Sequence, residues 1–138
     1  MTEIAQICAQ HGDDPSALLE ILHDVQATLG HVPEDALPDI ARRLNISRAE
    51  AHGVMSFYHD FRRDPARGVV VKICRAEACQ AMGAEALWTR IARRSGITVE
   101  PVYCLGNCAL APAAMVAGQL IGRADDARLT TAIAEAGA

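Results

Sequence analysis

Four of the five cysteines in this 138-residue chain fall into two short pairs. The pairs are Cys74-x4-Cys79 and Cys104-x3-Cys108, and residues 80–103 separate them. Four thiolates that come together can hold an iron–sulfur cluster or a zinc ion. The residues around the pairs, and the elements that position them, must decide between these two uses.

Other uses of the four cysteines fit the chain less well. The first residues, MTEIAQICAQHGDD, include acidic side chains and lack the cationic and then apolar pattern of a signal peptide, so we expect a cytoplasmic protein. Structural disulfides are disfavoured in that reducing compartment, and an odd number of cysteines suits them poorly. A thioredoxin-type redox motif needs C-x-x-C, which neither pair has. A structural zinc site stays open, because zinc accepts C-x2–4-C spacing.

The remaining candidate metal ligands lie apart from the two pairs. Cys8 belongs to the first helical segment, where we expect a buried or half-exposed free thiol. No histidine lies beside a cysteine pair, so a Rieske-type site with two histidine ligands is not expected. The five histidines are His11, His23, His31, His52 and His59.

Composition narrows the class of protein further. The formal net charge is −4, so the chain has no overall basic field for nucleic acid or for an anionic membrane surface. No apolar run approaches the roughly 20 residues of a membrane-spanning helix. Apolar residues make up 51% of the chain, which is enough for a core in one domain or in two small ones.

The first part of the chain has the pattern of a helical domain. Asp14 followed by Pro15 is an N-cap signal, and the apolar residues that follow keep a helical period until Gly30. Ser47 and Glu50 have the spacing of a capping box. Three helices are predicted, over residues 15–29, 34–44 and 47–58.

The polar, breaker-rich stretch FRRDPARG, residues 61–68, predicts a domain boundary. We therefore expect a helical docking domain over residues 1–65 and a second domain over residues 68–138. The second domain is predicted to contain strands at 69–73 and 97–103, a helix at 78–95, a hairpin of 113–117 and 120–123 turning at Gly118-Gln119, and a final helix capped by Asp125 or Asp126.

A strand–helix–strand unit pairs its strands in parallel through a right-handed crossover, and the hairpin adds antiparallel strands. The expected fold class is therefore α+β, with a helical segment followed by a thioredoxin-like domain around a mixed sheet. Cys74 and Cys104 end the two predicted parallel strands. Because the carboxyl ends of parallel strands share one edge of a sheet, we expect both cysteine pairs to converge there.

The second cysteine pair lies in a small, apolar loop that suits a cluster. Gly106 and Asn107 tolerate positive φ, which a backbone wrapped closely around a cluster would use. Leu105 and Leu110 can keep water away. A thiolate-ligated cluster is an anion, so backbone N–H groups and Arg75 would offset part of its charge.

Two segments resemble the thioredoxin-like [2Fe–2S] ferredoxin family. They are VKICRAEACQAMG, residues 71–83, and YCLGNCALAPAAMVAGQLIGR, residues 103–123. The helical segment HVPEDALPDIARRLNISRAEAHGVMSFYHDF also matches. The family includes the small electron-transfer subunits of respiratory complex I, of bidirectional hydrogenases and of NAD-dependent formate dehydrogenases. The resemblance implies that the cluster ligands are Cys74, Cys79, Cys104 and Cys108.

The first cysteine loop also distinguishes among the family's branches. Complex I members usually have Thr in this loop and Arg-Gly after the second ligand, whereas this loop reads CRAEACQAMG. This loop sequence resembles more closely that of the gamma subunit of a soluble NAD-dependent formate dehydrogenase. The resemblance implies FMN and NAD in a neighbouring subunit, and a molybdenum or tungsten cofactor in the formate-oxidising subunit. The complex I and hydrogenase alternatives stay open.

Catalytic residues are not expected in this chain itself. The sequence has no Gly-rich phosphate loop and no nucleophile–base pair, so we expect an electron carrier within a larger enzyme. A rival interpretation takes IARRLNISRAEAHGVMSF as a helix-turn-helix in a cluster-bearing regulator. Its second helix offers Arg48, Glu50 and His52 and then becomes apolar, in an acidic protein, so a docking arm for partner subunits is the better explanation.

Aromatic residues are few, and their expected roles are structural. We expect Phe57, Tyr58, Phe61 and Trp88 to pack in a core or at an interface. Tyr103, beside a candidate ligand, is expected either to shield the site or to pack in the core.

Overall fold

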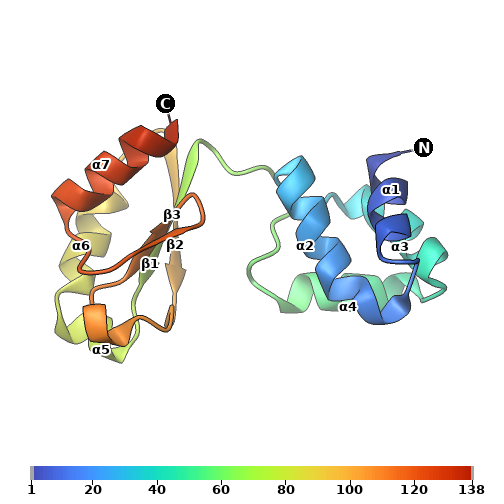
Figure 1. The fold of residues 1–138 in the computed structure, drawn as a ribbon, viewed down its shortest axis with the longest axis horizontal. Helices are drawn as coiled ribbons and strands as arrows, with labels where there is room; N and C mark the ends of the chain where they lie inside the picture. Colours follow the sequence, from blue (N-terminus) through green and yellow to red (C-terminus); the bar gives the residue numbers. More distant parts are fainter. Residues whose placement is uncertain (1, 138) are drawn as a thin grey trace. The chain divides into compact units, whose positions relative to one another are not determined.

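The computed structural model describes residues 2–137, and the chain divides into two compact units, Met1–Pro65 and Ala66–Ala138 (Figure 1). The division falls inside the polar stretch 61–68. Within residues 2–137, no helix combines the length and the apolar character needed to cross a bilayer.

The first unit, called here the helical unit, confirms the three predicted helices. Its elements are α1 (Glu3–Gln10), η1 (Pro15–Ala17), α2 (Leu18–Leu29), η2 (Glu34–Ala36), α3 (Leu37–Leu44) and α4 (Arg48–Phe57). The capping box forms as expected: the Glu50 N–H donates to Ser47 Oγ (3.1 Å), and the Ser47 N–H donates to Glu50 Oε2 (2.7 Å). The Asp14 side chain accepts from the backbone N–H of Ser16 (2.8 Å). Local capping chemistry thus sets where these helices begin.

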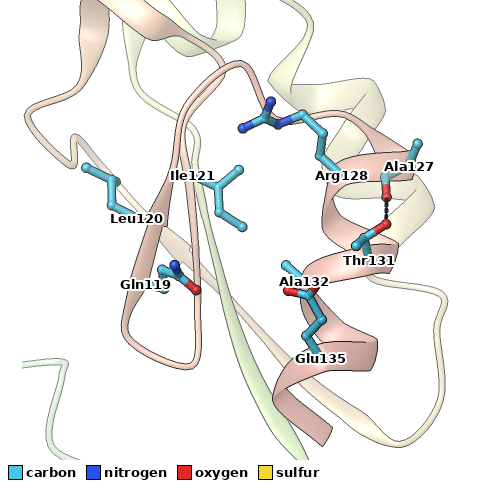
Figure 2. Close-up of a pocket in the computed structure, with 8 residues that line it drawn as sticks. All are labelled: Gln119, Leu120, Ile121, Ala127, Arg128, Thr131, Ala132 and Glu135. Atoms are coloured by element: carbon cyan, nitrogen blue, oxygen red, sulfur yellow. Dashed lines mark hydrogen bonds between the residues drawn. The ribbon is translucent and has the colours of Figure 1, made fainter. Parts of the chain in front are cut away.

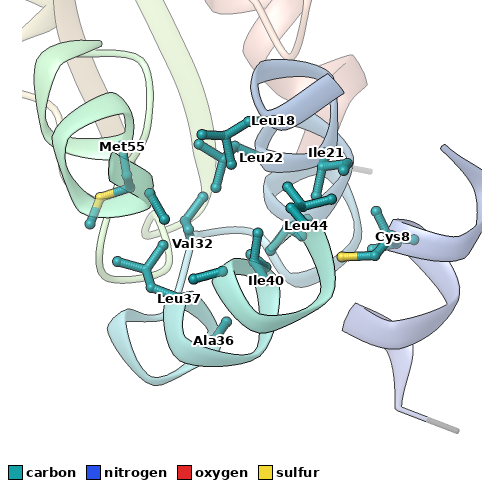
Figure 3. Close-up of a cluster of buried hydrophobic side chains, with 14 of the residues drawn as sticks. Cys8, Leu18, Ile21, Leu22, Val32, Ala36, Leu37, Ile40, Leu44 and Met55 are labelled. Carbon is teal, nitrogen blue, oxygen red and sulfur yellow. The ribbon is translucent and has the colours of Figure 1, made fainter. Parts of the chain in front are cut away.

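One large apolar cluster forms the core of the helical unit. Figure 3 shows buried side chains from α1, α2, α3 and α4 meeting in it. Its largest fully buried members are Ile21, Leu22, Ile40, Leu44 and Met55. Phe61 closes the cluster and is itself buried, whereas Phe57 is 72% exposed and Tyr58 43% exposed. Of these three aromatics, one is a core residue and two lie on the surface.

The second unit, called here the sheet unit, confirms the predicted α+β class. Its strands are β1 (Val69–Cys74), β2 (Ile97–Val102), β3 (Ala114–Val116) and β4 (Gln119–Ile121), in the order β2-β1-β3-β4. β1 and β2 are parallel, with Cys74 opposite Val102, and the other pairs are antiparallel. The sheet is therefore mixed, and its two parallel strands lie side by side.

The helices of the sheet unit correct one prediction. In place of a single helix over residues 78–95, there are α5 (Glu77–Ala81) and α6 (Ala84–Ile91), separated at Met82 and Gly83. Gly83 has a φ of +93°, which a helix cannot include. α6 and α7 (Asp126–Gly137) lie on the same side of the sheet (Figure 1). Together with the sheet they bury a second apolar cluster that includes Val71, Ile73, Leu87, Ile91 and Leu129.

The hairpin between β3 and β4 forms, but its turn lies one residue earlier than predicted. Ala117 and Gly118 have φ values of +48° and +83°, the signs that a type I′ turn requires at both central positions. Gln119 is already the first residue of β4. The register explains the shift, because Val116 pairs with Gln119 across the turn.

Candidate iron–sulfur site

The carboxyl ends of β1 and β2 position two short loops. Cys74 is the last residue of β1, and its N–H donates to the Ala113 carbonyl (3.0 Å). The next residue, Arg75, donates its N–H to the Val102 carbonyl at the end of β2 (2.8 Å). β2 ends at Val102, one residue before the predicted end of this strand at Tyr103. Cys104 lies two residues after Val102. The first cysteine loop, residues 74–79, and the second, residues 104–108, thus start from neighbouring strand ends.

The four sulfur atoms come together as two pairs. The Sγ atoms of Cys104 and Cys108 are 3.7 Å apart. Two thiolates about 2.3 Å from one tetrahedral metal ion would lie about 3.8 Å apart, so this separation suits a shared metal ion. Cys74 and Cys79 lie in one buried cluster, and each influences the pKa of the other. Cys108 contributes to the raised pKa of Cys79, and Cys74 contributes to the raised pKa of Cys108.

The two pairs differ in their exposure. Cys74 is 2% exposed and Cys79 1% exposed, whereas Cys104 and Cys108 both lie on the surface. Three alanines pack around the buried pair: Ala84, Ala111 and Ala113. These small side chains let the backbone approach the sulfur atoms closely. One side of the site is therefore enclosed, and the other faces outward.

The backbone of both loops stabilises the charged form of Cys74. Burial by itself raises the pKa of this thiol, yet the net shift is downward. Hydrogen bonds from the backbone of Ala76 and from the Cys79 thiol lower the pKa. The backbone at Cys104 and Leu105, in the second loop, lowers it further. The second loop therefore lies near enough to Cys74 to influence its pKa.

Two other thiols have raised pKa values. Burial raises the pKa of Cys79, and the neighbouring Cys74 raises it further. The pKa of Cys108 is raised first by its hydrogen bond with Cys104 and then by the charge of that group. Thiols that crowd together hold their protons because several adjacent thiolates repel one another. A bound metal removes this penalty, since its positive charge favours the deprotonated ligands.

Backbone N–H groups also donate hydrogen bonds to two other sulfur atoms. Gly106 donates to Cys104 Sγ (3.3 Å), and Ala113 donates to Cys79 Sγ (3.4 Å). Such donors stabilise negative charge on sulfur, and they are among the features that tune iron–sulfur clusters. These hydrogen bonds to sulfur, and the presence of four cysteine side chains, suit an anionic group that is bound by thiolates.

The four cysteines lie as two pairs at the ends of β1 and β2. Across residues 2–137, no three Cys, His, Asp or Glu side chains gather closely enough to surround one metal ion. A [2Fe–2S] cluster takes four thiolates, two on each iron, so its ligands are divided as these are.

Cys104, Asn107 and Leu110, in and beside the second loop, depart from expectation. Gly106 has the predicted positive φ of +75°, but Asn107 does not, and Cys104 has a φ of +102° instead. Leu110 is 42% exposed, so in this chain alone it does not exclude water. Tyr103 is 71% exposed, so it does not pack in the core as one of its two expected roles required.

Arg75 lies beside the site, as expected, but the sequence did not reveal its partners. Its guanidinium donates to both carboxylate oxygens of Glu85, at 3.0 Å and 2.8 Å. The guanidinium carbon also lies 4.6 Å from the centre of the Trp88 ring. Glu85 and Trp88 are three residues apart on α6, so they share one face of that helix. This spacing was visible in the sequence, but nothing there linked it to Arg75.

Cys8 takes no part in this site. It is completely buried in the core of the helical unit, and Figure 3 shows its sulfur directed at other buried side chains. Burial raises the pKa of the Cys8 thiol, and the nearby Asp13 raises it further. The expected free, buried thiol is confirmed. Among the histidines, His11 contacts Asp24 at 2.7 Å within the same unit.

A separate hollow of about 440 Å³ lies between β4 and α7. Figure 2 shows Gln119, Leu120 and Ile121 on one side of it, with Arg128 and Glu135 on the other. None of the four cysteines lines this hollow. It is therefore distinct from the cysteine site.

Comparison with known proteins identifies the family to which the chain is similar. A sequence model of thioredoxin-like [2Fe–2S] ferredoxins matches residues 4–137. The chain is 35% identical over 118 residues to a subunit of the NADH-quinone oxidoreductase of Pseudomonas aeruginosa, covering 77% of this chain and 71% of that protein. It is 24% identical over 144 residues to the HndA subunit of the NADP-reducing hydrogenase of Solidesulfovibrio fructosivorans, covering 96% and 84%.

A solved structure shares the fold. The NAD+-reducing [NiFe]-hydrogenase in the H2-reduced state superposes with a TM-score of 0.66 at 25% identity. The match covers 86% of this chain and 22% of the hydrogenase chain, so this chain spans about a fifth of that protein.

Proposed function

Because the chain belongs to the thioredoxin-like [2Fe–2S] ferredoxin family, which implies a [2Fe–2S] cluster, we propose that it is the small electron-transfer subunit of an NAD-linked oxidoreductase. The proposed iron ligands are Cys74, Cys79, Cys104 and Cys108. The observation that supports this most directly is the position of the two cysteine pairs at the neighbouring ends of β1 and β2, with the Sγ atoms of Cys104 and Cys108 3.7 Å apart.

The residues of this chain have distinct tasks in this function. The cluster, when bound, accepts and passes on one electron at a time. The four cysteines hold it, and backbone N–H groups such as those of Gly106 and Ala113 stabilise charge on the sulfur atoms. The exposed side of the site, at Cys104 and Cys108, gives a partner a short path to the cluster.

For the enzyme itself, we propose a cytoplasmic NAD-dependent formate dehydrogenase. This proposal is supported by the sequence of the first cysteine loop, CRAEACQAMG, which lacks the Thr that is usual in complex I members. The proposed partners are a subunit that binds FMN and NAD, and a catalytic subunit that oxidises formate at a molybdenum or tungsten cofactor. Residues 1–65 are proposed as the docking arm for these partners, with no role for nucleic acid or membrane.

A second candidate is supported by the relatives. The similarity to an NADH-quinone oxidoreductase subunit, at 35% identity, favours membership in a complex I type of enzyme. The similarity to the hydrogenases favours an NAD-linked hydrogenase equally. In each case this chain keeps the same task, because the cysteine site is unchanged.

Purification of the native complex tests the choice among the three enzymes. The partner subunits are identified by mass spectrometry, and NAD reduction is measured separately with formate and with hydrogen. We expect formate-dependent NAD reduction. NADH oxidation with quinone in a complex that contains membrane subunits would replace the formate assignment with complex I, and hydrogen-dependent NAD reduction would replace it with a hydrogenase.

The cluster itself is tested on this chain. Iron and acid-labile sulfide should each be present at about two per chain, the stoichiometry of the cluster. A colourless protein with one zinc ion would overturn the site assignment. Deletion of residues 1–65 tests the docking arm: the remaining chain should still bind iron but should bind the partner subunits more weakly.

A further inference from the structure

The side chain and backbone of Arg75 are fixed at four points beside the cysteine site. Its N–H donates to the Val102 carbonyl (2.8 Å), and its own carbonyl accepts from Gln80 Nε2 (2.7 Å). Its guanidinium forms the two hydrogen bonds to Glu85 and lies over the Trp88 ring. One residue thus joins the ends of both parallel strands to α5 and α6.

The position of Arg75 in the first cysteine loop brings a positive charge close to Cys74. Arg75 directly follows Cys74 in the chain, and its N–H is bonded to the carbonyl of Val102, two residues before Cys104. An arginine guanidinium and a glutamate carboxylate are both ionised at neutral pH. The two hydrogen bonds that Arg75 donates to Glu85 therefore join one cation and one anion in a fixed geometry.

An exposed ion pair usually contributes little to stability, since water screens it and two long side chains must be ordered. Here the bidentate geometry and the aromatic ring restrict the guanidinium, and its side chain is only 28% exposed. The contacts therefore fix where a charge lies relative to the thiols. A fixed charge matters most to a group that changes its own charge, as an iron–sulfur cluster does when it takes up an electron.

We propose that Arg75 is a positioning residue of the cluster: Glu85 and Trp88 hold its guanidinium so that it anchors the first cysteine loop and places a partly neutralised positive charge beside the thiolates. This inference rests on the proposed cluster site. The charge of Arg75 raises the reduction potential, because it stabilises the more negative, reduced form. The carboxylate of Glu85 limits that effect.

The test measures the midpoint reduction potential of the full-length protein with its iron–sulfur cluster, by an EPR-monitored titration with dithionite. Arg75→Gln should lower the potential, and Glu85→Gln should raise it. The double variant should lie nearer the parent than either single variant does, since it removes both charges. A merely structural role would not give potential shifts of opposite sign in the two single variants that cancel in the double variant.

A conservative variant separates charge from anchoring. Arg75→Lys keeps the charge but loses the bidentate bonds and the flat stacking on Trp88. Its potential should stay near that of the parent, while the loss of iron to a chelator should become about fivefold faster, the factor expected when a contact worth about 1 kcal/mol is removed. An unchanged rate of iron loss would remove the anchoring half of the proposal.

The matched control is a second ion pair in the same unit. Arg94 donates to Asp126 (3.1 Å), and the exposures of the two side chains, 30% and 50%, are close to those of Arg75 and Glu85, 28% and 49%. Arg94 follows α6 and precedes Ile97, which pairs with the first residue of β1, at the far end from Cys74. Arg94→Gln and Asp126→Asn should leave the potential unchanged.

The possible results have separate meanings. If the parent chain binds no [2Fe–2S] cluster, the proposed function fails. If the parent binds the cluster but the Arg75 and Glu85 variants shift its potential in the same direction, or no more than the control variants do, the inference alone is wrong. If Arg75→Gln does not retain a cluster, the other two variants test the inference. A raised potential in Glu85→Gln and faster iron loss in Arg75→Lys support it, and the absence of both overturns it.

Discussion

The helical unit and the sheet unit bury different kinds of side chain. The core of the helical unit contains large aliphatic residues, such as Ile21, Ile40 and Leu44, in one continuous cluster. The sheet unit has such a core only between its sheet and α6 and α7. At the carboxyl ends of β1 and β2 it buries two cysteines among alanines instead.

This difference separates stability from function along the chain. Burial of a large aliphatic side chain contributes about 1.5–3 kcal/mol, whereas alanine buries much less surface. The end of the sheet unit that holds the cysteine site therefore has little apolar surface of its own. Where cysteine ligands stand in place of large apolar side chains, the free energy of metal binding contributes to the free energy of folding.

Removal of iron should have the largest effect, and it should lower amide protection in the sheet unit but not in the helical unit. Anaerobic chelation should abolish the visible absorbance. Amide hydrogen exchange should then become faster by orders of magnitude in the two cysteine loops and at the end of β1, because their metal ligation is lost. Amides of α2, α3 and α4 should keep their protection. Equal loss of protection in both units would show that the contrast between them is wrong.

Cysteine variants sharpen the same test. Serine at Cys74 should lose or destabilise the cluster, since a hydroxyl is a harder and far less acidic ligand than a thiol. Cys8→Ser is the matched control, and it should keep the spectrum because Cys8 lies in the core of the helical unit. A spectrum lost in the Cys8 variant alone would show that the ligands are misassigned.

A core truncation in the helical unit should have the opposite pattern. Leu44 is 1% exposed and lies inside the large cluster. Leu44→Ala should lower the free energy of unfolding of the helical unit by about 3 kcal/mol, from lost apolar burial and the cavity left behind. Urea unfolding followed by amide signals of α3 measures this. The visible spectrum of the cluster should be unchanged, and a loss of iron would mean that the helical unit supports the site.

Gly68 offers an intermediate effect in the sheet unit. A Cβ at this position would lie 1.9 Å from the Gly96 carbonyl oxygen, and its φ of +65° already favours glycine. Gly68→Ala should therefore cost about 2–3 kcal/mol, measured by thermal unfolding. Gly96→Ala is the control, because its φ of +77° is similar but no atom lies within 4 Å of the added Cβ. It should cost about 1 kcal/mol, and an equal cost at both sites would exclude the backbone clash as the cause.

Sequence reasoning succeeded where structure is set by neighbouring residues. The capping box at Ser47 and Glu50 depends on two side chains three residues apart, and it formed as expected. That β1 and β2 end side by side followed from parallel pairing, and the register of Cys74 with Val102 bears out this pairing. Such signals are local or follow from chain topology, so a single sequence contains them.

Sequence reasoning failed where distant contacts decide. A glycine inside a helix costs only about 1 kcal/mol, so the sequence could not show that Gly83 separates two helices. The hairpin turn moved to Ala117 because pairing of β3 with both neighbours fixes the register. The partners of Arg75 lie on α6, and only the packing of that helix beside β1 brings them together.

The capping box should give the smallest effect, confined to the helical unit. Ser47→Ala removes the acceptor for the Glu50 N–H and should lower the free energy of unfolding by about 1 kcal/mol. Amide signals of α4 during urea unfolding measure this, and the cluster's spectrum should not change.

The other half of the capping box adds a dependence on pH. The backbone N–H of Ser47, and then its side chain, hold the pKa of Glu50 below its usual range. A lowered folded-state pKa means that the stabilising contribution is complete above the unfolded pKa, about 4.3, and is lost as the pH falls through the lower folded value. The stability difference between the parent and Glu50→Gln should therefore be present at pH 7 and shrink at pH 3. A difference that grew on acidification would mean that the carboxylate is not the form that caps α4.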